Sequence, residues 1–155
     1  TRKTTPGLRL LEKYASACGG SYNHRMGLYD RILIKDNHLA AAGVFEGSEL
    51  ENYLRSIVQN KESDVIVEVE IDQISQVSPA VEAGVDAILL DNFSPDNIKK
   101  IVEEVQNKVV IEASGGITES SIIHYAKARP HFISTGAPIH SGRWVDIGLD
   151  WKERI

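Results

Sequence analysis

Polar groups follow the first three of five short apolar runs in this sequence, and their types are suited to binding a charged ligand. Lys35 follows the first run, Glu70 lies at the end of the second, and Asp91 closes the third. In α/β proteins, ligands bind over the carboxyl ends of the strands. If the apolar runs are parallel strands, these three side chains are therefore expected to meet on one face of the sheet.

Glycine-rich steps follow the remaining two runs, at Ser114-Gly115-Gly116 and at Thr135-Gly136. Glycine lets backbone N–H groups approach a phosphate closely, and a helix beginning beyond Thr118 would add its positive end. Two carboxylates at neighbouring strand ends could bind Mg²⁺ or the hydroxyl groups of a sugar. Phosphate, sugar and metal sites on one face together suggest a phosphorylated ribose.

Strands and helices are expected to alternate along the chain from about residue 31. The apolar runs, which are rich in β-branched residues and leucine as in strands buried on both faces, are residues 32–34, 65–71, 87–90, 109–111 and 132–134. Amphipathic helical patterns cover residues 50–59, 74–83, 97–107 and 119–128. This alternation predicts an α/β fold with a parallel sheet, either doubly wound or closed as a barrel.

Capping signals support these helices. Ser94 followed by Pro95 predicts a helix start, as does Thr118, and Gly84 predicts a left-handed helix end. An earlier amphipathic helix is expected to open near Pro6 and to close at Gly19.

Size and composition fit one soluble-type domain covering residues 1–155. Hydrophobic residues make up 42% and charged residues 25% of the sequence, which is ordinary for a globular protein. No apolar run approaches the roughly 20 residues needed to cross a bilayer. The single cysteine, Cys18, excludes an internal disulfide and favours a reducing compartment, so we expect a cytoplasmic protein.

The net charge of −5 is unevenly distributed. Residues 1–38 contain seven Lys and Arg against three Asp and Glu, whereas the rest contains ten against nineteen. A nucleic-acid surface would need a broad basic patch, so this distribution instead favours a small anionic ligand held near the amino-terminal end.

Other common chemistries find no support in the residue spacing. The histidines and Cys18 do not form a zinc-binding pattern, and the sequence contains no GxGxxG or Walker loop. His124 falls within a predicted helix and is expected on its surface.

Seven motifs, in this order and spacing, resemble the quinolinate phosphoribosyltransferase family: TRKTTPGLR, SYNHRMGLYD, ILIKDNH, VEVEID, ILLDNF, EASGGIT and ISTGAPIHS. The resemblance implies an amino-terminal α/β domain followed by an open, incomplete TIM-like barrel, in a homodimer. This chain resembles the barrel alone, and the resemblance begins at the end of the barrel's first strand. The first strand and the amino-terminal domain are therefore expected to lie outside it.

The resemblance also implies roles for individual residues. Arg2, Lys3, His24 and Arg25 correspond to the residues that bind the two carboxylates of quinolinate, and Lys35 reaches both substrates. Glu70 and Asp91 correspond to the acidic pair near the ribose hydroxyls and Mg²⁺, whereas Ser114, Gly115 and Gly136 correspond to the loops around the 5′-phosphate. The catalytic set implied is Lys3, Lys35, Glu70 and Asp91. Glu68, His38 and His140 stay open between ligand contact and structural support.

The implied reaction transfers a phosphoribosyl group from phosphoribosyl pyrophosphate to quinolinate, with decarboxylation, in NAD biosynthesis. Alternatives are a nicotinate-specific enzyme of the same fold, and an inactive barrel fragment or another phosphate-binding barrel. Because the resemblance implies an arginine from the partner subunit's missing domain, the chain alone is expected to show little or no turnover. Residues 129–131 and 137–139 depart from the family pattern and flank the Gly136 loop.

Overall fold

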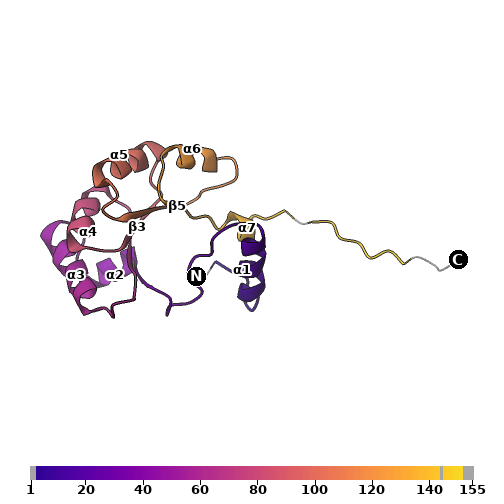
Figure 1. Ribbon diagram of the computed structural model, residues 1–155, viewed down its shortest axis with the longest axis horizontal. Coiled ribbons are helices and arrows are strands. Elements are labelled where there is room, and N and C mark those ends of the chain that lie inside the picture. The colour runs from indigo at the N-terminus through magenta and orange to yellow at the C-terminus, as the bar shows by residue number, and fades with distance from the viewer. Residues whose placement is uncertain (1–2, 144, 152–155) are drawn as a thin grey trace.

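A five-stranded, all-parallel sheet organises the chain in the computed structural model, which describes residues 3–143 and 145–151 (Figure 1). Its strands are β1 (Ile32–Ile34), β2 (Val67–Ile71), β3 (Ala87–Asp91), β4 (Val110–Ser114) and β5 (Phe132–Ile133). They lie side by side in sequence order, without reversal. A doubly wound sheet reverses its strand order at a switch point, so this order is that of a barrel wall, and the α/β prediction is confirmed.

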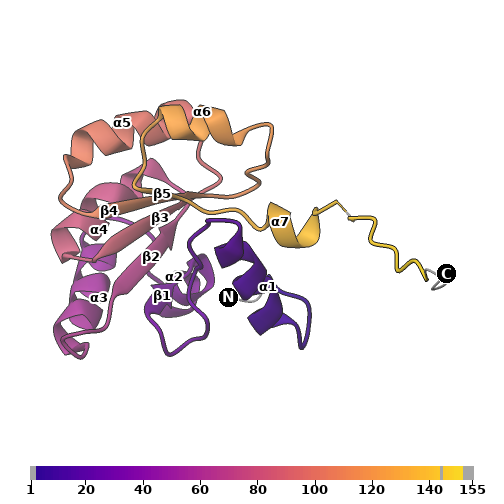
Figure 2. The same cartoon turned by 45° about the vertical axis from the view of Figure 1, so that its right-hand side comes forward.

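Helices connect the strands and cover one side of the sheet. Those described are α1 (Arg9–Cys18), α2 (Asp36–Ala42), α3 (Gly47–Asn60), α4 (Val77–Ala83), α5 (Pro95–Val105), α6 (Ile122–Lys127) and α7 (Ala137–His140), with a 3-10 turn, η1, at Ile74–Gln76. Figure 2 shows α3 to α6 outside the sheet, whereas α1 and the amino-terminal segment lie toward its other side. Right-handed crossovers between neighbouring parallel strands place their helices on the same side.

Alternation along β2 separates the hydrophobic core from the candidate site. Val67, Val69 and Ile71 are buried in the core cluster together with residues of the covering helices, including Leu50 and Leu54. Because successive side chains of a strand point to opposite faces, Glu68 and Glu70 lie on the face away from those helices.

Two of the predicted caps are confirmed and one is wrong. The Ser94 side chain accepts a hydrogen bond from the Asn97 backbone N–H at 3.3 Å, and Gly84 ends α4 in the left-handed conformation. Thr118 does not cap α6, because Thr118 to Ser121 form a separate turn and the helix begins at Ile122. The Ser121 hydroxyl lies 2.9 Å from the Thr118 backbone nitrogen and accepts its hydrogen bond.

Two short helices, α2 and α7, were not predicted. Both follow strands directly, and seven and four residues are too few for helical periodicity to show in the sequence. Helix α1 forms as predicted, but its apolar residues Leu11 and Tyr14 are exposed and its buried residue is Lys13. No helix among the described residues is long and apolar enough to cross a membrane.

Replacing Leu54 with alanine is expected to lower the free energy of unfolding by about 2–5 kcal/mol, because it leaves a cavity beneath α3. Leu54 is fully buried in the core cluster. The matched control is Leu10→Ala on α1, where the side chain is 73% exposed and a change within about 0.5 kcal/mol is expected. Urea unfolding measures the free energy of unfolding of both variants. Equal losses of stability in the two would contradict the assigned core.

Candidate functional site

Four charged side chains converge near the carboxyl ends of β1, β2 and β3. Lys35, directly after β1, forms an ion pair with Glu70 of β2. Asp91 ends β3, and desolvation together with the neighbouring Glu70 carboxylate raises its pKa, against the lowering effect of Lys3 and Lys35. Lys3, although distant along the sequence, thus contributes positive charge at Asp91.

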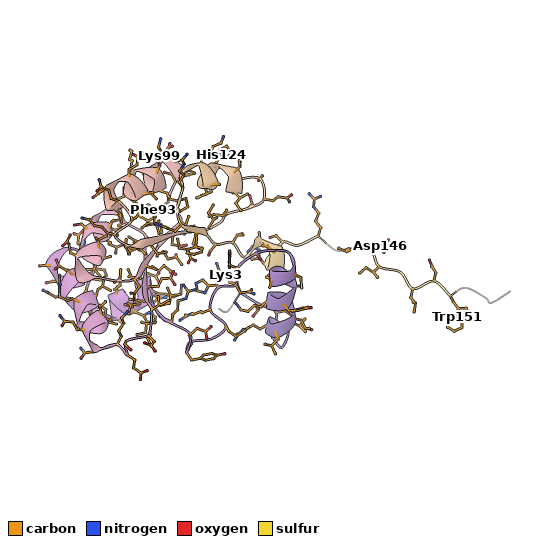
Figure 3. All side chains as sticks on the ribbon, in the orientation of Figure 1. Lys3, Phe93, Lys99, His124, Asp146 and Trp151 are labelled. Atoms are coloured by element: carbon orange, nitrogen blue, oxygen red, sulfur yellow. The ribbon has the colours of Figure 1, made fainter. Side chains whose placement is uncertain are left out.

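Lys3 approaches the site from the open side of the sheet. In Figure 3 it lies between the sheet and helices α1 and α7, whereas Lys99 and His124 lie on the outer side of the layer formed by α5 and α6. A side-chain carbon of Lys3 would lie 3.3 Å from a Cβ added at Gly136. The structure thus brings Lys3, Lys35, Glu70, Asp91 and Gly136 together, and the Arg2 prediction falls outside the described residues.

The Ser114-Gly115-Gly116 turn packs closely against the end of β3. The Asn92 backbone N–H donates to the Ser114 carbonyl at 3.0 Å, and Asn92 itself adopts a left-handed conformation with φ of 59°. A Cβ on Gly115 would lie 2.5 Å from the Asn92 nitrogen, and Gly115 has φ of +93°. Only glycine fits there, so this turn holds Gly115 beside Asp91.

The Gly136 turn has a different reason for its glycine. Its φ is −90°, which any residue can adopt, but a Cβ there would lie 3.0 Å from the His140 ring. His140 is exposed, and its Nδ1 lies 2.8 Å from the Ser141 hydroxyl. The glycine therefore provides space beneath His140 and Lys3.

The loop of residues 21–31 carries His24 and Arg25 and has no helix or strand. The Lys13 ammonium donates to the His24 carbonyl at 2.5 Å, and the Asn23 amide donates to the Lys13 carbonyl at 2.9 Å. Arg25 donates to the Arg31 carbonyl at 3.1 Å. Helix α1 therefore fixes the loop near His24, and the loop's own end fixes Arg25.

Two charged residues of the site, Arg31 and Glu112, were not predicted. The Arg31 guanidinium binds the Glu68 carboxylate at 2.9 Å, and Glu112 accepts a hydrogen bond from the Ser134 hydroxyl at 2.5 Å. The His24 Nε2 atom lies 3.8 Å from Glu68 and 3.9 Å from Glu112. A carboxylate directly after the apolar run of residues 109–111, and before Ala113, was the available signal for Glu112.

Burial changes the protonation of the group formed by His24, Glu68 and Glu112. Desolvation, with the nearby Arg31 guanidinium as the next cause, lowers the pKa of His24 to about 3. Desolvation and the charge of Glu112 raise the pKa of Glu68 to about 7. At neutral pH the His24 imidazole is therefore neutral and can donate through only one ring nitrogen.

Two groups of side chains could in principle bind a metal ion. Glu70 and Asp91 offer oxygen ligands suited to Mg²⁺, and desolvation, followed by the neighbouring Glu70 carboxylate, raises the pKa of Asp91. His24, Glu68 and Glu112 place their ligand atoms within 4.8 Å of one another. Arg31 pairs with Glu68 and Lys35 pairs with Glu70, so a cation already compensates one carboxylate in each group. The all-oxygen ligands of Glu70 and Asp91 are the type that suits Mg²⁺.

The remaining histidines lie at structural positions. His38 accepts a hydrogen bond from the Lys35 backbone N–H at 2.9 Å through Nδ1, and so supports the start of α2. His131 accepts from the Ile111 backbone N–H at 2.9 Å. The surface position predicted for His124 is confirmed on α6.

Comparison with known proteins identifies the family to which this arrangement belongs. Residues 1–150 match the model described as quinolinate phosphoribosyl transferase, C-terminal domain. The chain belongs to the quinolinate phosphoribosyl transferase C-terminal domain family.

Among the curated members of this family, the chain is 43% identical to a probable carboxylating nicotinate-nucleotide pyrophosphorylase of Bacillus subtilis, over 97% of this chain and 50% of that protein. It is 42% identical to the corresponding Methanocaldococcus jannaschii protein, over 97% of this chain and 53% of that protein. A solved nicotinate-nucleotide pyrophosphorylase from Ehrlichia chaffeensis superimposes with a TM-score of 0.86 and 40% identity, covering 97% of this chain and 53% of that one. The chain thus spans about half the length of the relatives it matches.

Replacing Gly115 with alanine is expected to distort the turn between β4 and α6, because its Cβ would overlap the Asn92 backbone. A loss of about 1–3 kcal/mol of unfolding free energy is expected for such a strained position. Gly116→Ala is the control, since it also has positive φ but has open space around its Cβ. Thermal unfolding compares the two, and a Gly116 variant as unstable as the Gly115 variant would show that backbone strain alone matters.

Acid is expected to weaken the folded chain through His24. Its pKa is about 3 in the fold against an ordinary value of 6.5, so the unfolded state binds more protons between these values and stability falls as pH falls through them. This one group removes at most about 1.4 kcal/mol per pH unit.

His24→Gln lacks this contribution. The difference in unfolding free energy between the wild type and this variant should therefore shrink from pH 7.5 to pH 5, as measured by urea unfolding. Titration of Glu68 has the opposite effect on stability, because its pKa is raised in the fold. Glu68 is present in both proteins, so its contribution largely cancels in that difference. A difference that is constant with pH would contradict a half-buried, neutral His24.

Proposed function

We propose that the full-length protein carrying this chain transfers ribose 5-phosphate from phosphoribosyl pyrophosphate to quinolinate and removes one carboxylate as CO₂. The observation that carries the proposal is the convergence of Lys3, Lys35, Glu70 and Asp91 at the carboxyl ends of neighbouring strands. The names of the relatives, nicotinate-nucleotide pyrophosphorylase [carboxylating], support the same reaction written in reverse.

The acceptor quinolinate carries two carboxylates, and we assign them to the cationic side of the site. Lys3 and Lys35 supply ammonium groups, Arg25 supplies a guanidinium, and His24 supplies a single neutral donor, with Arg2 assigned by resemblance. A dianion removed from water needs several charged donors. The cationic balance of residues 1–38 supports this assignment.

The phosphoribosyl donor is assigned to the acidic and glycine side of the site. Glu70 and Asp91 would bind the ribose hydroxyls and hold Mg²⁺, whereas Ser114, Gly115 and Gly136 would surround the 5′-phosphate through backbone N–H groups. When bound, Mg²⁺ neutralises charge on the leaving pyrophosphate.

In the proposed reaction, the pyridine nitrogen forms a bond to the ribose anomeric carbon while the bond from that carbon to pyrophosphate breaks. Positive charge develops on the sugar, and the Glu70 and Asp91 carboxylates stabilise it electrostatically. The C–C bond to the adjacent carboxylate then breaks, its electron pair stays on the ring carbon beside the positive nitrogen, and a proton replaces CO₂. The chain's main contribution is to orient the two substrates.

We further propose that the protein works as a homodimer in the cytoplasm, with residues 1–155 as its catalytic domain. The dimer rests on the family resemblance. The compartment rests on the single cysteine, Cys18, which is exposed and unpaired and so suits a reducing environment.

Lys3→Ala and Arg25→Ala are expected to abolish quinolinate binding while leaving the affinity for phosphoribosyl pyrophosphate within about twofold, because each removes a charge assigned to the acceptor alone. Calorimetry on the full-length protein measures both affinities, and Lys100→Ala on the exposed side of α5 is the control. Unchanged quinolinate affinity in both variants would refute the assignment. Parallel assays with nicotinate, which has one carboxylate, separate the two acceptors.

A further inference from the structure

Two carboxylates lie one layer below the site, where a packed strand face usually carries apolar side chains. Glu68 is fully buried and Glu112 is 5% exposed. In parallel barrels the inward layers are dominated by valine, isoleucine and leucine. Buried carboxylates are costly unless paired and hydrogen-bonded, and well-packed apolar residues often stabilise as much. Stability alone therefore does not account for these two acids.

The contacts of Glu68 and Glu112 reach the loop that carries His24 and Arg25. Glu68 Oε2 binds the Arg31 guanidinium at 2.9 Å, and both carboxylates face His24 Nε2. Glu112 is oriented in turn by the Ser134 hydroxyl after β5. Glu68 and Glu112 thus join β2 and β4 to a loop that has no helix or strand.

A chain of contacts runs from Glu68 to Arg25. The carboxylate fixes the Arg31 side chain, and the Arg31 backbone carbonyl accepts the hydrogen bond from Arg25 at 3.1 Å. The loop is also attached to α1, where Lys13 donates to the His24 carbonyl, Asn23 donates to the Lys13 carbonyl and Arg9 donates to the Met26 carbonyl. Without Glu68, the loop would keep its attachments to α1 and to the start of β1, where the Ile32 N–H donates to the Ile66 carbonyl at 2.9 Å. It would lose the contact that fixes the Arg31 side chain over the sheet.

We propose that Glu68 and Glu112 are positioning residues, which hold Arg31 and pack against the His24 ring so that the loop presents Arg25 to the acceptor carboxylates. The proposal rests on the proposed function for its substrate. It assigns no contact between either acid and the substrate. A carboxylate suits this role because it binds a guanidinium in a defined orientation, which an apolar side chain cannot do.

The kinetic test uses Glu68→Gln and Glu112→Gln in the full-length protein, with the exposed Glu104→Gln of α5 as the control. Both variants are expected to raise the KM for quinolinate about 10-fold or more, the size typical of residues that orient a binding group indirectly. The KM for phosphoribosyl pyrophosphate should stay unchanged. If Glu68 acts through Arg31, adding Glu68→Gln to Arg31→Met should cost nothing further, because the two changes remove one interaction.

Amide hydrogen exchange provides a readout that does not depend on activity. Glu68→Gln should speed exchange in residues 21–31 and leave the amides of β3 unchanged, which separates a loosened loop from a weakened fold. Equal rises in both KM values with faster exchange throughout the sheet would reduce the acids to a structural role and overturn the proposal. Unchanged exchange and KM would also overturn it. If the wild type does not use quinolinate, the proposed function fails, and the exchange result still decides the positioning role.

Discussion

The alternation of side chains along β2 is the constraint on which the rest of this structure depends. Val67, Val69 and Ile71 face the covering helices, and the two carboxylates between them face the opposite side. One strand therefore holds the hydrophobic core together and carries acidic groups into the site. Because both faces are specified, hydrophobic burial and charge pairing select the same register, and the ladder places Glu70 beside Leu89 and Glu68 beside Ala87.

Acids on a largely enclosed face need cations, and the chain supplies them from segments outside the sheet. Lys35 extends from the end of β1 to Glu70, and Arg31 reaches Glu68 from the residue just before β1. The first strand is thus flanked by the two cations that compensate the second strand. This accounts for the positive charge of residues 1–38 in an otherwise acidic chain: the early cations complement buried acids of the sheet as well as any anionic ligand.

The sequence was sufficient to predict the sheet, because short apolar runs separated by capped amphipathic helices leave few arrangements. It also located Lys35, Glu70 and Asp91 at one edge, since parallel strands place their carboxyl ends together. Residue spacing alone could not place Lys3 with these residues, which only the family resemblance implied, because its position depends on the path of an irregular segment. The role of Arg31 was hidden for a related reason: it comes from pairing with a residue 37 positions away. Glu112 was missed because its contacts, with His24 and Ser134, come from distant parts of the sequence that residue spacing cannot pair.

The bond between the Asn92 backbone and the Ser114 carbonyl has one more consequence. It ties the ends of β3 and β4 together, and the lack of space for a Cβ on Gly115 keeps the turn closed against Asn92. Asp91 and the glycine turn therefore form a rigid pair with a fixed separation. If a sugar phosphate binds at both points as proposed, this separation selects its length as well as its charge, and a sugar phosphate of another size would fit one end only.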